Sequence, residues 1–193
     1  MMLKKLIKII LLSYMLILLP QTVLANTPVF DENLRQRLVE AINDSESFTD
    51  KYVAEVWLTD MSQRMRRYVK NKEERIAILK VLHEEAKRVD IAPELILSVI
   101  QVESAFNRFA ISSVGARGLM QVMPFWLKEI GKPHENMFDI RVNLRMGCTI
   151  LRYYLDREKN DKVKALARYN GSVGKRKYPD KVFKALNRRW YRQ

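Results

Sequence analysis

The residues that hold metals and disulfides are scarce in this 193-residue chain. It has a single cysteine, Cys148, and two histidines, His83 and His134. One cysteine cannot form an intramolecular disulfide, and the three residues together give no metal-ligand cluster. Cys148 stands on the apolar face of an expected helix, where a lone thiol is a small core residue. We therefore expect no metal and no cofactor.

Strand patterns are also lacking once the first 25 residues are passed. Strict alternation of apolar and polar residues is absent, as are internal repeats and low-complexity linkers, and apolar residues recur at helical spacing. Candidate N-caps are Thr49, Asp139 and Asp161, and Pro93 and Pro179 suit the first turns of helices. The pattern predicts an all-α fold, with helices near residues 53–68, 76–90, 93–103, 119–130 (interrupted or begun near residue 124), 139–155, 161–169 and 179–186.

Acidic residues are in the minority, since 22 Asp and Glu face 35 Lys and Arg, for a formal net charge of +13. The first 25 residues have three lysines and no acid, so the rest of the chain retains +10. Such a charge suits nucleic acid, an anionic cell wall or a membrane surface. Residues 1–25 resemble an export signal, which argues against nucleic acid as the partner, and no nucleic-acid recognition motif is present.

Residues 1–25 have the layout of a secretory signal peptide. Three lysines precede the apolar run 9–19, and residues 23–25 place small side chains where a signal peptidase cuts. The apolar run is shorter than the roughly 20 residues of a membrane span. We expect cleavage after Ala25 and a periplasmic or secreted protein. An uncleaved leader is the alternative, and it would be the only attachment to a membrane.

The remaining 168 residues are enough for one domain with its own core. We expect a helical segment over residues 26–72, packed on a compact domain over residues 73–193. The tail from Lys175 onward is rich in lysine and arginine. Such a run is usually a solvated face, and here it could also hold anionic wall polymer.

Glu103 is the acid whose surroundings favour chemistry. Ile96, Val99 and Ile100 precede it by seven, four and three residues and share its helical face. A carboxyl on an apolar face is desolvated, which raises its pKa and allows it to act as a general acid near neutral pH. Spacing alone favours the alternative, in which Glu103 is a structural partner of an arginine such as Arg117.

The sequence around and beyond Glu103 weighs against that alternative. Four stretches carry the pattern: Glu-Ser-Ala-Phe-Asn at 103–107, Ala-Ile-Ser at 110–112, Gly-Ala-Arg-Gly-Leu-Met-Gln-Val-Met-Pro at 115–124, and Ala-Leu-Ala-Arg-Tyr-Asn-Gly at 165–171. Together they resemble the family-1 soluble lytic transglycosylases, or SLT domain, over about residues 73–186. The Glu-Ser and Gly-Leu-Met-Gln combination is highly specific, and Tyr178 with Val182 looks like the family's closing helix.

The resemblance implies a lysozyme-like α-helical fold with a saccharide groove and assigns Glu103 as the catalytic acid/base. It places substrate-binding positions at Ser112, Gln121, Met123, Tyr169 and Asn170. Ser112 corresponds to a hydroxyl that hydrogen-bonds near the catalytic glutamate, and Tyr169 to the tyrosine whose hydroxyl lies beside that carboxyl. The family usually has a small residue before its Tyr-Asn pair and Ala-Gly after it. In this chain Arg168 precedes the pair and Gly171-Ser172 follows it. The resemblance therefore does not determine the conformation of this loop.

The reaction implied by the resemblance needs one carboxyl, whereas ordinary glycosidases use two. No acid lies between Ser104 and Glu129. We therefore expect a peptidoglycan lytic transglycosylase that cleaves the β-1,4 bond between N-acetylmuramic acid and N-acetylglucosamine and leaves 1,6-anhydromuramyl ends. The alternatives are a goose-type lysozyme-like muramidase, which adds water, and a non-catalytic wall-binding module.

The expected partner is the peptidoglycan glycan strand, bound by a monomer without nucleic acid. The sequence leaves open whether cleavage is internal or from chain ends. It also leaves open whether the activity serves wall turnover or local opening for a secretion or conjugation apparatus.

Overall fold

The computed structural model describes residues 50–129 and 134–191. The chain divides into two units, Met1–Asp31 and Glu32–Gln193, and every described residue belongs to the second. The expected leader and the expected cap at Thr49 lie outside the described residues. No described helix combines the length and apolar character needed to cross a membrane.

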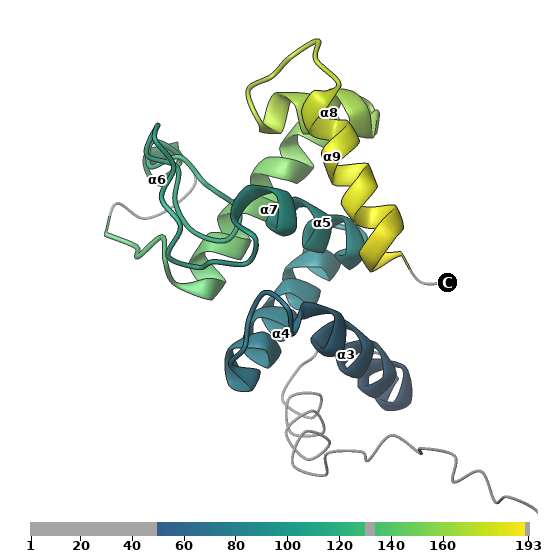
Figure 1. Cartoon of the computed structure of the whole chain (residues 1–193). Coiled ribbons are helices and arrows are strands. Elements are labelled where there is room, and N and C mark those ends of the chain that lie inside the picture. The colour runs from purple at the N-terminus through teal and green to yellow at the C-terminus, as the bar shows by residue number, and fades with distance from the viewer. Residues whose placement is uncertain (1–49, 130–133, 192–193) are drawn as a thin grey trace, which may run out of the picture. The chain divides into compact units, whose positions relative to one another are not determined.

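The regular structure of the described residues is helical (Figure 1). The elements are α3 (Lys51–Met65), α4 (Lys72–Arg88), α5 (Pro93–Ser104), α6 (Trp126–Glu129), α7 (Ile140–Arg157), α8 (Lys162–Tyr169), α9 (Lys177–Ala185) and a π-helical turn, η1 (Leu186–Trp190). Strands are missing from this part of the chain, although two isolated bridges join Arg117 to Ile111 and to Val122. The all-α prediction is confirmed for the described residues.

Short polar side chains begin most of the longer helices, as the sequence predicts. The carboxylates of Asp139 and Asp161 each accept the N–H three residues further on, at 3.0 and 3.1 Å. Asp50 caps α3 by accepting the N–H groups two and three residues on, at 2.8 and 3.0 Å. One expectation is wrong by two residues, because α9 begins at Lys177 and Pro179 lies inside its first turn. A proline fits there because first-turn N–H groups have no partner within the helix.

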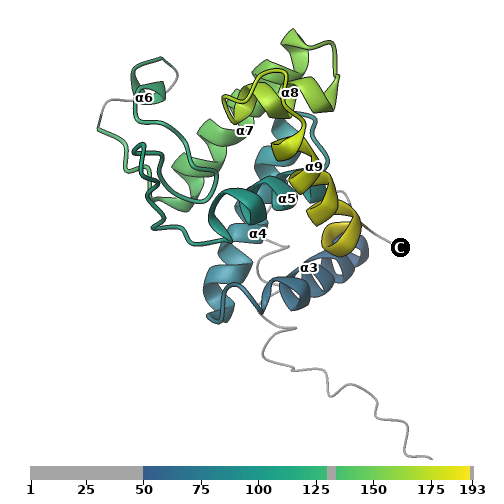
Figure 2. The same cartoon turned by 45° about the horizontal axis from the view of Figure 1, so that its top comes forward.

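The described helices share one hydrophobic core, and α5 runs through it. In both views α9 lies beside α5 (Figures 1 and 2), and residues of α5 also contact α4 and η1. The α5 side chains Ile96, Leu97, Val99 and Ile100 are fully buried. Helix α3 adds apolar side chains to the same core, whereas residues 26–49 of the expected N-terminal segment lie outside the described part of the chain.

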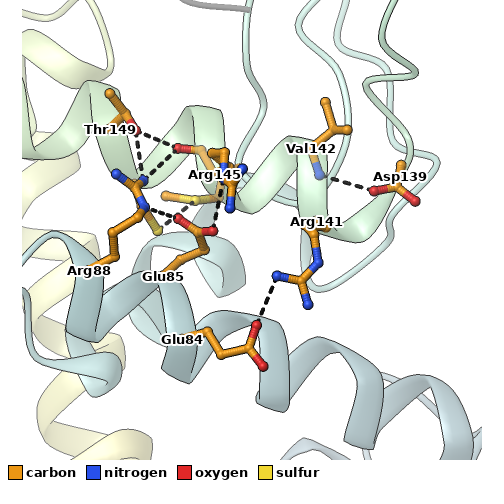
Figure 3. A network of polar contacts seen from close by, with 10 residues as sticks. Glu84, Glu85, Arg88, Asp139, Arg141, Val142, Arg145 and Thr149 are labelled. Carbon is orange, nitrogen blue, oxygen red and sulfur yellow. Dashed lines mark hydrogen bonds and ion pairs between the residues drawn. The ribbon is translucent and has the colours of Figure 1, made fainter. Parts of the chain in front are cut away.

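A buried carboxylate ties α4 to α7 (Figure 3). Glu85 is only 2 % exposed, and it accepts hydrogen bonds from Arg88 Nε at 2.5 Å and from Arg145 Nε at 3.1 Å. Cys148 lies in the core nearby, fully buried, with its sulfur 3.9 Å from the sulfur of Met120. The structure confirms that Cys148 is a core residue, and burial raises the pKa of its thiol.

Candidate active site

A cavity of about 230 Å³ lies where the C-terminal end of α5 meets the loop before α6 and the end of α8. It brings together all six site residues that the sequence predicted: Glu103, Ser112, Gln121, Met123, Tyr169 and Asn170. The rest of its lining is apolar, from Val114, Ala116, Val122, Trp126 and Ile150. The predicted positions, up to 67 residues apart in sequence, thus share one concave surface.

Glu103 is the penultimate residue of α5, and its helix ends at once because Ala105 adopts a left-handed backbone with φ of 49°. The carboxyl Oε1 accepts a hydrogen bond from the Tyr178 hydroxyl at 2.6 Å. Burial raises the pKa of Glu103 to about 7, against the opposing effect of that hydrogen bond. Glu103 is therefore protonated in a large fraction of molecules near neutral pH.

The ion-pair interpretation of Glu103 does not hold. Among the described residues no lysine or arginine forms an ion pair with Glu103, and Arg117 is exposed. A nearby cation would favour the charged carboxylate and oppose the effect of burial. Its absence is what leaves desolvation as the dominant influence on the pKa.

Two tyrosines lie at this site in different roles. The hydroxyl bonded to Glu103 belongs to Tyr178 of α9, which the sequence had indicated only as part of a closing helix. The hydroxyl of Tyr169 donates instead to the Met120 carbonyl, at 2.8 Å, while its ring lines the cavity. Burial, followed by the nearby Glu103, raises the pKa of both tyrosines, so both are neutral donors.

Asn143 of α7 holds the loop that forms the cavity wall. Its side chain is buried, accepts the Met120 N–H at 2.8 Å, and donates to the carbonyls of Arg117 and Met137, both at 2.9 Å. Gly118 is packed against it with φ of 76°, and a Cβ there would stand 2.3 Å from the Asn143 amide nitrogen. Sequence reasoning missed Asn143, although a polar residue on the apolar face of α7 was a usable signal.

Gln121 and Ser112 also hold the loop in place. The Gln121 amide nitrogen donates to the carbonyls of Ala110 and Gly118, at 3.2 and 3.0 Å. Ser112 Oγ accepts the Ala116 N–H at 3.0 Å, which leaves the hydroxyl proton able to donate. Both residues line the cavity while their own hydrogen bonds set the shape of its wall.

The unusual residues around the Tyr-Asn pair leave that pair in the cavity. Arg168 forms an ion pair with Glu158 and does not line the cavity. Asn170 is the C-cap residue that follows α8, and its N–H donates to the Leu166 carbonyl at 3.1 Å. Gly171 follows in a left-handed turn with φ of 70°. The substitution at residue 168 is therefore accommodated by an acid outside the site.

Within the described residues, Glu103 is the sole acid that lines the cavity, and no cation lines it. The site thus offers one carboxyl that can carry a proton near neutral pH, a neutral hydroxyl bonded to it, and walls in which polar and apolar side chains alternate. Such a group can donate a proton to a leaving oxygen and then accept one back.

The sequence of this chain is similar to those of known proteins. The sequence profile described as the transglycosylase SLT domain matches residues 80–189. A transglycosylase of Enterobacteria phage PRD1 is 37% identical over 105 residues, which cover 51% of this chain and 38% of the phage protein. Membrane-bound lytic murein transglycosylase C of Histophilus somni (strain 2336) is 33% identical over 141 residues, covering 56% of this chain and 39% of that protein. The chain thus spans about two fifths of the length of these relatives.

Two proteins of known structure are also similar to this chain. The lytic transglycosylase Slt of Pseudomonas aeruginosa is 19% identical, with a TM-score of 0.46 over 78% of this chain and 33% of that one. The 70 kDa soluble lytic transglycosylase of Escherichia coli is 20% identical, with a TM-score of 0.41 over 80% of this chain and 29% of that one.

Proposed function

We propose that this chain, which belongs to the transglycosylase SLT family, is a lytic transglycosylase that cleaves the glycan strands of peptidoglycan. The observation that carries the proposal is the state of Glu103. Its carboxyl lies in the cavity lined by the predicted site residues, bonded to Tyr178, with its pKa raised to about 7. One such group can serve as acid and then as base.

In the first half of the proposed reaction, Glu103 donates its proton to the glycosidic oxygen between N-acetylmuramic acid and N-acetylglucosamine. The bond from that oxygen to the muramyl C1 breaks, and the electron pair stays with the oxygen. The muramyl N-acetyl oxygen stabilises the positive charge that develops at C1. The Tyr178 hydrogen bond stabilises the Glu103 carboxylate that this step creates.

In the second half, the Glu103 carboxylate removes the proton from the muramyl C6 hydroxyl. The C6 oxygen bonds to C1, the N-acetyl group is released unchanged, and a 1,6-anhydromuramyl end forms. Glu103 is again protonated at the end. No water is consumed, because the C6 hydroxyl of the substrate is the nucleophile. The absence of a second acid from the described lining of the cavity supports this route over the two-carboxyl mechanism of most glycosidases.

Product analysis tests the proposed activity. The purified chain is incubated with sacculi, and the released muropeptides are analysed by mass spectrometry. Anhydro ends are expected. Reducing ends alone would favour the goose-type hydrolase, and a protein that binds sacculi without releasing products would be a wall-binding module.

We also propose that the chain is exported and cut after Ala25, into the periplasm or the medium. The support is the order of lysines, apolar run and small residues over 1–25. N-terminal sequencing of the exported protein should begin at Asn26. A mature protein that begins at Met1 would instead show an uncleaved membrane anchor.

A further inference from the structure

A second cavity, of about 410 Å³, opens beside α9 and η1 and shares no lining residue with the Glu103 cavity. Residues of α5, α9, η1 and the segment after α3 form its wall. Five of its lining side chains are cationic and none is acidic: Arg67, Lys181, Lys184, Arg188 and Arg189. We call these five residues and the space between them the basic pocket.

The cations of the basic pocket are not neutralised within the described residues. None of the five forms an ion pair with an aspartate or glutamate there. The other large cavity, of about 550 Å³, differs because Asp90 and Glu94 accompany Arg152 and Lys162 in its lining. Like charges around one concave surface repel each other and concentrate anions from solution. The basic pocket therefore favours a ligand with several negative oxygens.

Core contacts hold the backbone of the basic pocket in place. Trp190 of η1 is fully buried, and its Nε1 donates to Gln101 Oε1 at 2.8 Å. Arg64 Nη1 donates to the Arg189 carbonyl at 2.6 Å. The guanidinium groups of Arg67 and Arg189 both lie over the Tyr68 ring, at 5.3 and 6.0 Å from its centre. The arginines are thus partly ordered before any ligand binds.

The position of the basic pocket points to its ligand. Val102, in its wall, directly precedes Glu103, and Lys181 stands one helical turn after Tyr178, whose hydroxyl is bonded to Glu103. The basic pocket and the Glu103 cavity are thus lined by consecutive residues of α5, and α9 supplies both Lys181 of the basic pocket and the hydroxyl bonded to Glu103. In peptidoglycan the muramyl residues carry short peptides, and these peptides have free carboxylates.

We propose that the basic pocket binds the carboxylates of the stem peptide on the glycan strand being cleaved, an inference that rests on the proposed function. Guanidinium groups suit this ligand because their paired N–H groups match the two oxygens of a carboxylate. The basic pocket would make the enzyme prefer strands that carry peptides over strands without them.

The test compares glycan strands with intact stem peptides and the same strands stripped of peptides. One variant combines Lys181→Gln, Lys184→Gln and Arg188→Gln. A matched control combines Lys70→Gln, Lys159→Gln and Lys175→Gln, three exposed lysines that line neither the basic pocket nor the Glu103 cavity. Both triple variants lose the same net charge. The readout is the ratio of kcat/KM on intact strands to kcat/KM on stripped strands, because misfolding lowers both values and leaves the ratio unchanged.

Wild type and the control should prefer intact strands by about tenfold or more, as expected for one or two charge-assisted hydrogen bonds. The basic-pocket variant should lose most of that preference. An unchanged ratio in that variant, or an equal loss in the control, would overturn the proposal.

A binding measurement separates this proposal from the proposed activity. Free stem peptide is titrated into the full chain and into both triple variants by calorimetry. If the wild type degrades neither strand, the proposed function fails, and peptide binding that depends on the basic pocket would still support this site. Absence of peptide binding, or binding only of anionic phospholipid vesicles through the same residues, would overturn it.

Discussion

Glu85 and Glu103 are two carboxyls with opposite surroundings, the first buried between helices and the second half-buried in the wall of a cavity. Glu85 is 2 % exposed and lies between Arg88 and Arg145 (Figure 3). Glu103 has no ion-pair partner among residues 50–129 and 134–191, and its hydrogen-bond partner, Tyr178, is neutral. The arginines compensate the charge of the Glu85 carboxylate, which joins α4 to α7. The Glu103 carboxyl is desolvated without a compensating cation among the described residues, and this desolvation raises its pKa to about 7.

Burial of an acid therefore does not by itself indicate chemistry. Removing a compensated charge from the core leaves its partners unsatisfied and costs stability. An uncompensated acid costs stability when it ionises, so its retention in a cavity indicates a role other than folding. Substitutions at Glu103 should therefore change activity, and a substitution at Glu85 should change stability.

The largest effect is expected for Glu103→Gln. An amide has nearly the same size but can neither protonate the leaving oxygen nor take the proton from the C6 hydroxyl, so both half-reactions fail. Turnover of sacculi should fall by about 10²–10⁴ or more. The control is Glu84→Gln, which removes an acid paired with Arg141 at 2.8 Å outside the Glu103 cavity and should leave turnover close to wild type. A folded Glu103→Gln protein with near-normal turnover would refute the catalytic assignment.

The same variant should change the pH dependence of stability. The pKa of Glu103 is about 7 in the folded protein and near its ordinary 4.5 when unfolded. Between these values the unfolded chain loses the proton first, so Glu103 lowers the free energy of unfolding as pH rises from about 4.5 to 7. The full loss is up to about 3 kcal/mol above pH 7.

Chemical denaturation of wild type and Glu103→Gln at pH 5 and pH 8 measures this contribution. The stability of the variant relative to wild type should be greater at pH 8 than at pH 5. A relative stability that does not change between the two pH values would mean that Glu103 ionises in the folded protein as it does in water.

Glu85→Gln should act in the opposite way, on stability. The amide leaves Arg88 and Arg145 without their carboxylate and directs N–H groups at other donors. Because both arginines are partly exposed and can be hydrated, we expect a loss of roughly 1–3 kcal/mol in the free energy of unfolding. Denaturant titration measures it, and the folded variant should retain most of its turnover. A loss of turnover without a loss of stability would contradict a structural role.

Local signals in the sequence predicted much of this architecture. The apolar spacing before Glu103 correctly predicted its helix and its buried face, because helical periodicity is determined by neighbouring residues. The caps at Asp139 and Asp161 were predicted for the same reason. The six site residues were predicted from the family resemblance, and the structure places all of them around one cavity.

Contacts between distant segments could not be predicted in this way. Tyr178 is 75 residues from Glu103, and periodicity places it on a helix without naming its partner. Asn143 bonds to three backbone groups that come together only when the loop folds over α7. The basic pocket likewise needs cations from α9, η1 and the segment after α3 in one place. The basic tail was noted from the sequence, but its concave arrangement with Arg67 was not.

The smallest predicted effect concerns the hydrogen bond that distinguishes Glu103 from an isolated buried acid. Tyr178→Phe removes the hydroxyl that donates to Glu103 at 2.6 Å. That hydrogen bond favours the carboxylate and lowers the pKa of Glu103, so its loss should raise the pKa further above 7. The first step needs protonated Glu103, and kcat/KM should therefore fall on the alkaline side of that pKa. The alkaline limb of the pH–rate profile should move to higher pH in the variant. The maximal rate should drop by roughly tenfold, because the carboxylate formed on proton donation loses its stabilising partner.

Tyr169→Phe is the matched control, since the Tyr169 hydroxyl donates to the Met120 carbonyl and its removal leaves the bond from Tyr178 to Glu103 in place. Its alkaline limb should stay closer to that of wild type. If the limb of Tyr178→Phe stays in place or moves to lower pH, Tyr178 does not set the proton affinity of the proposed catalytic acid.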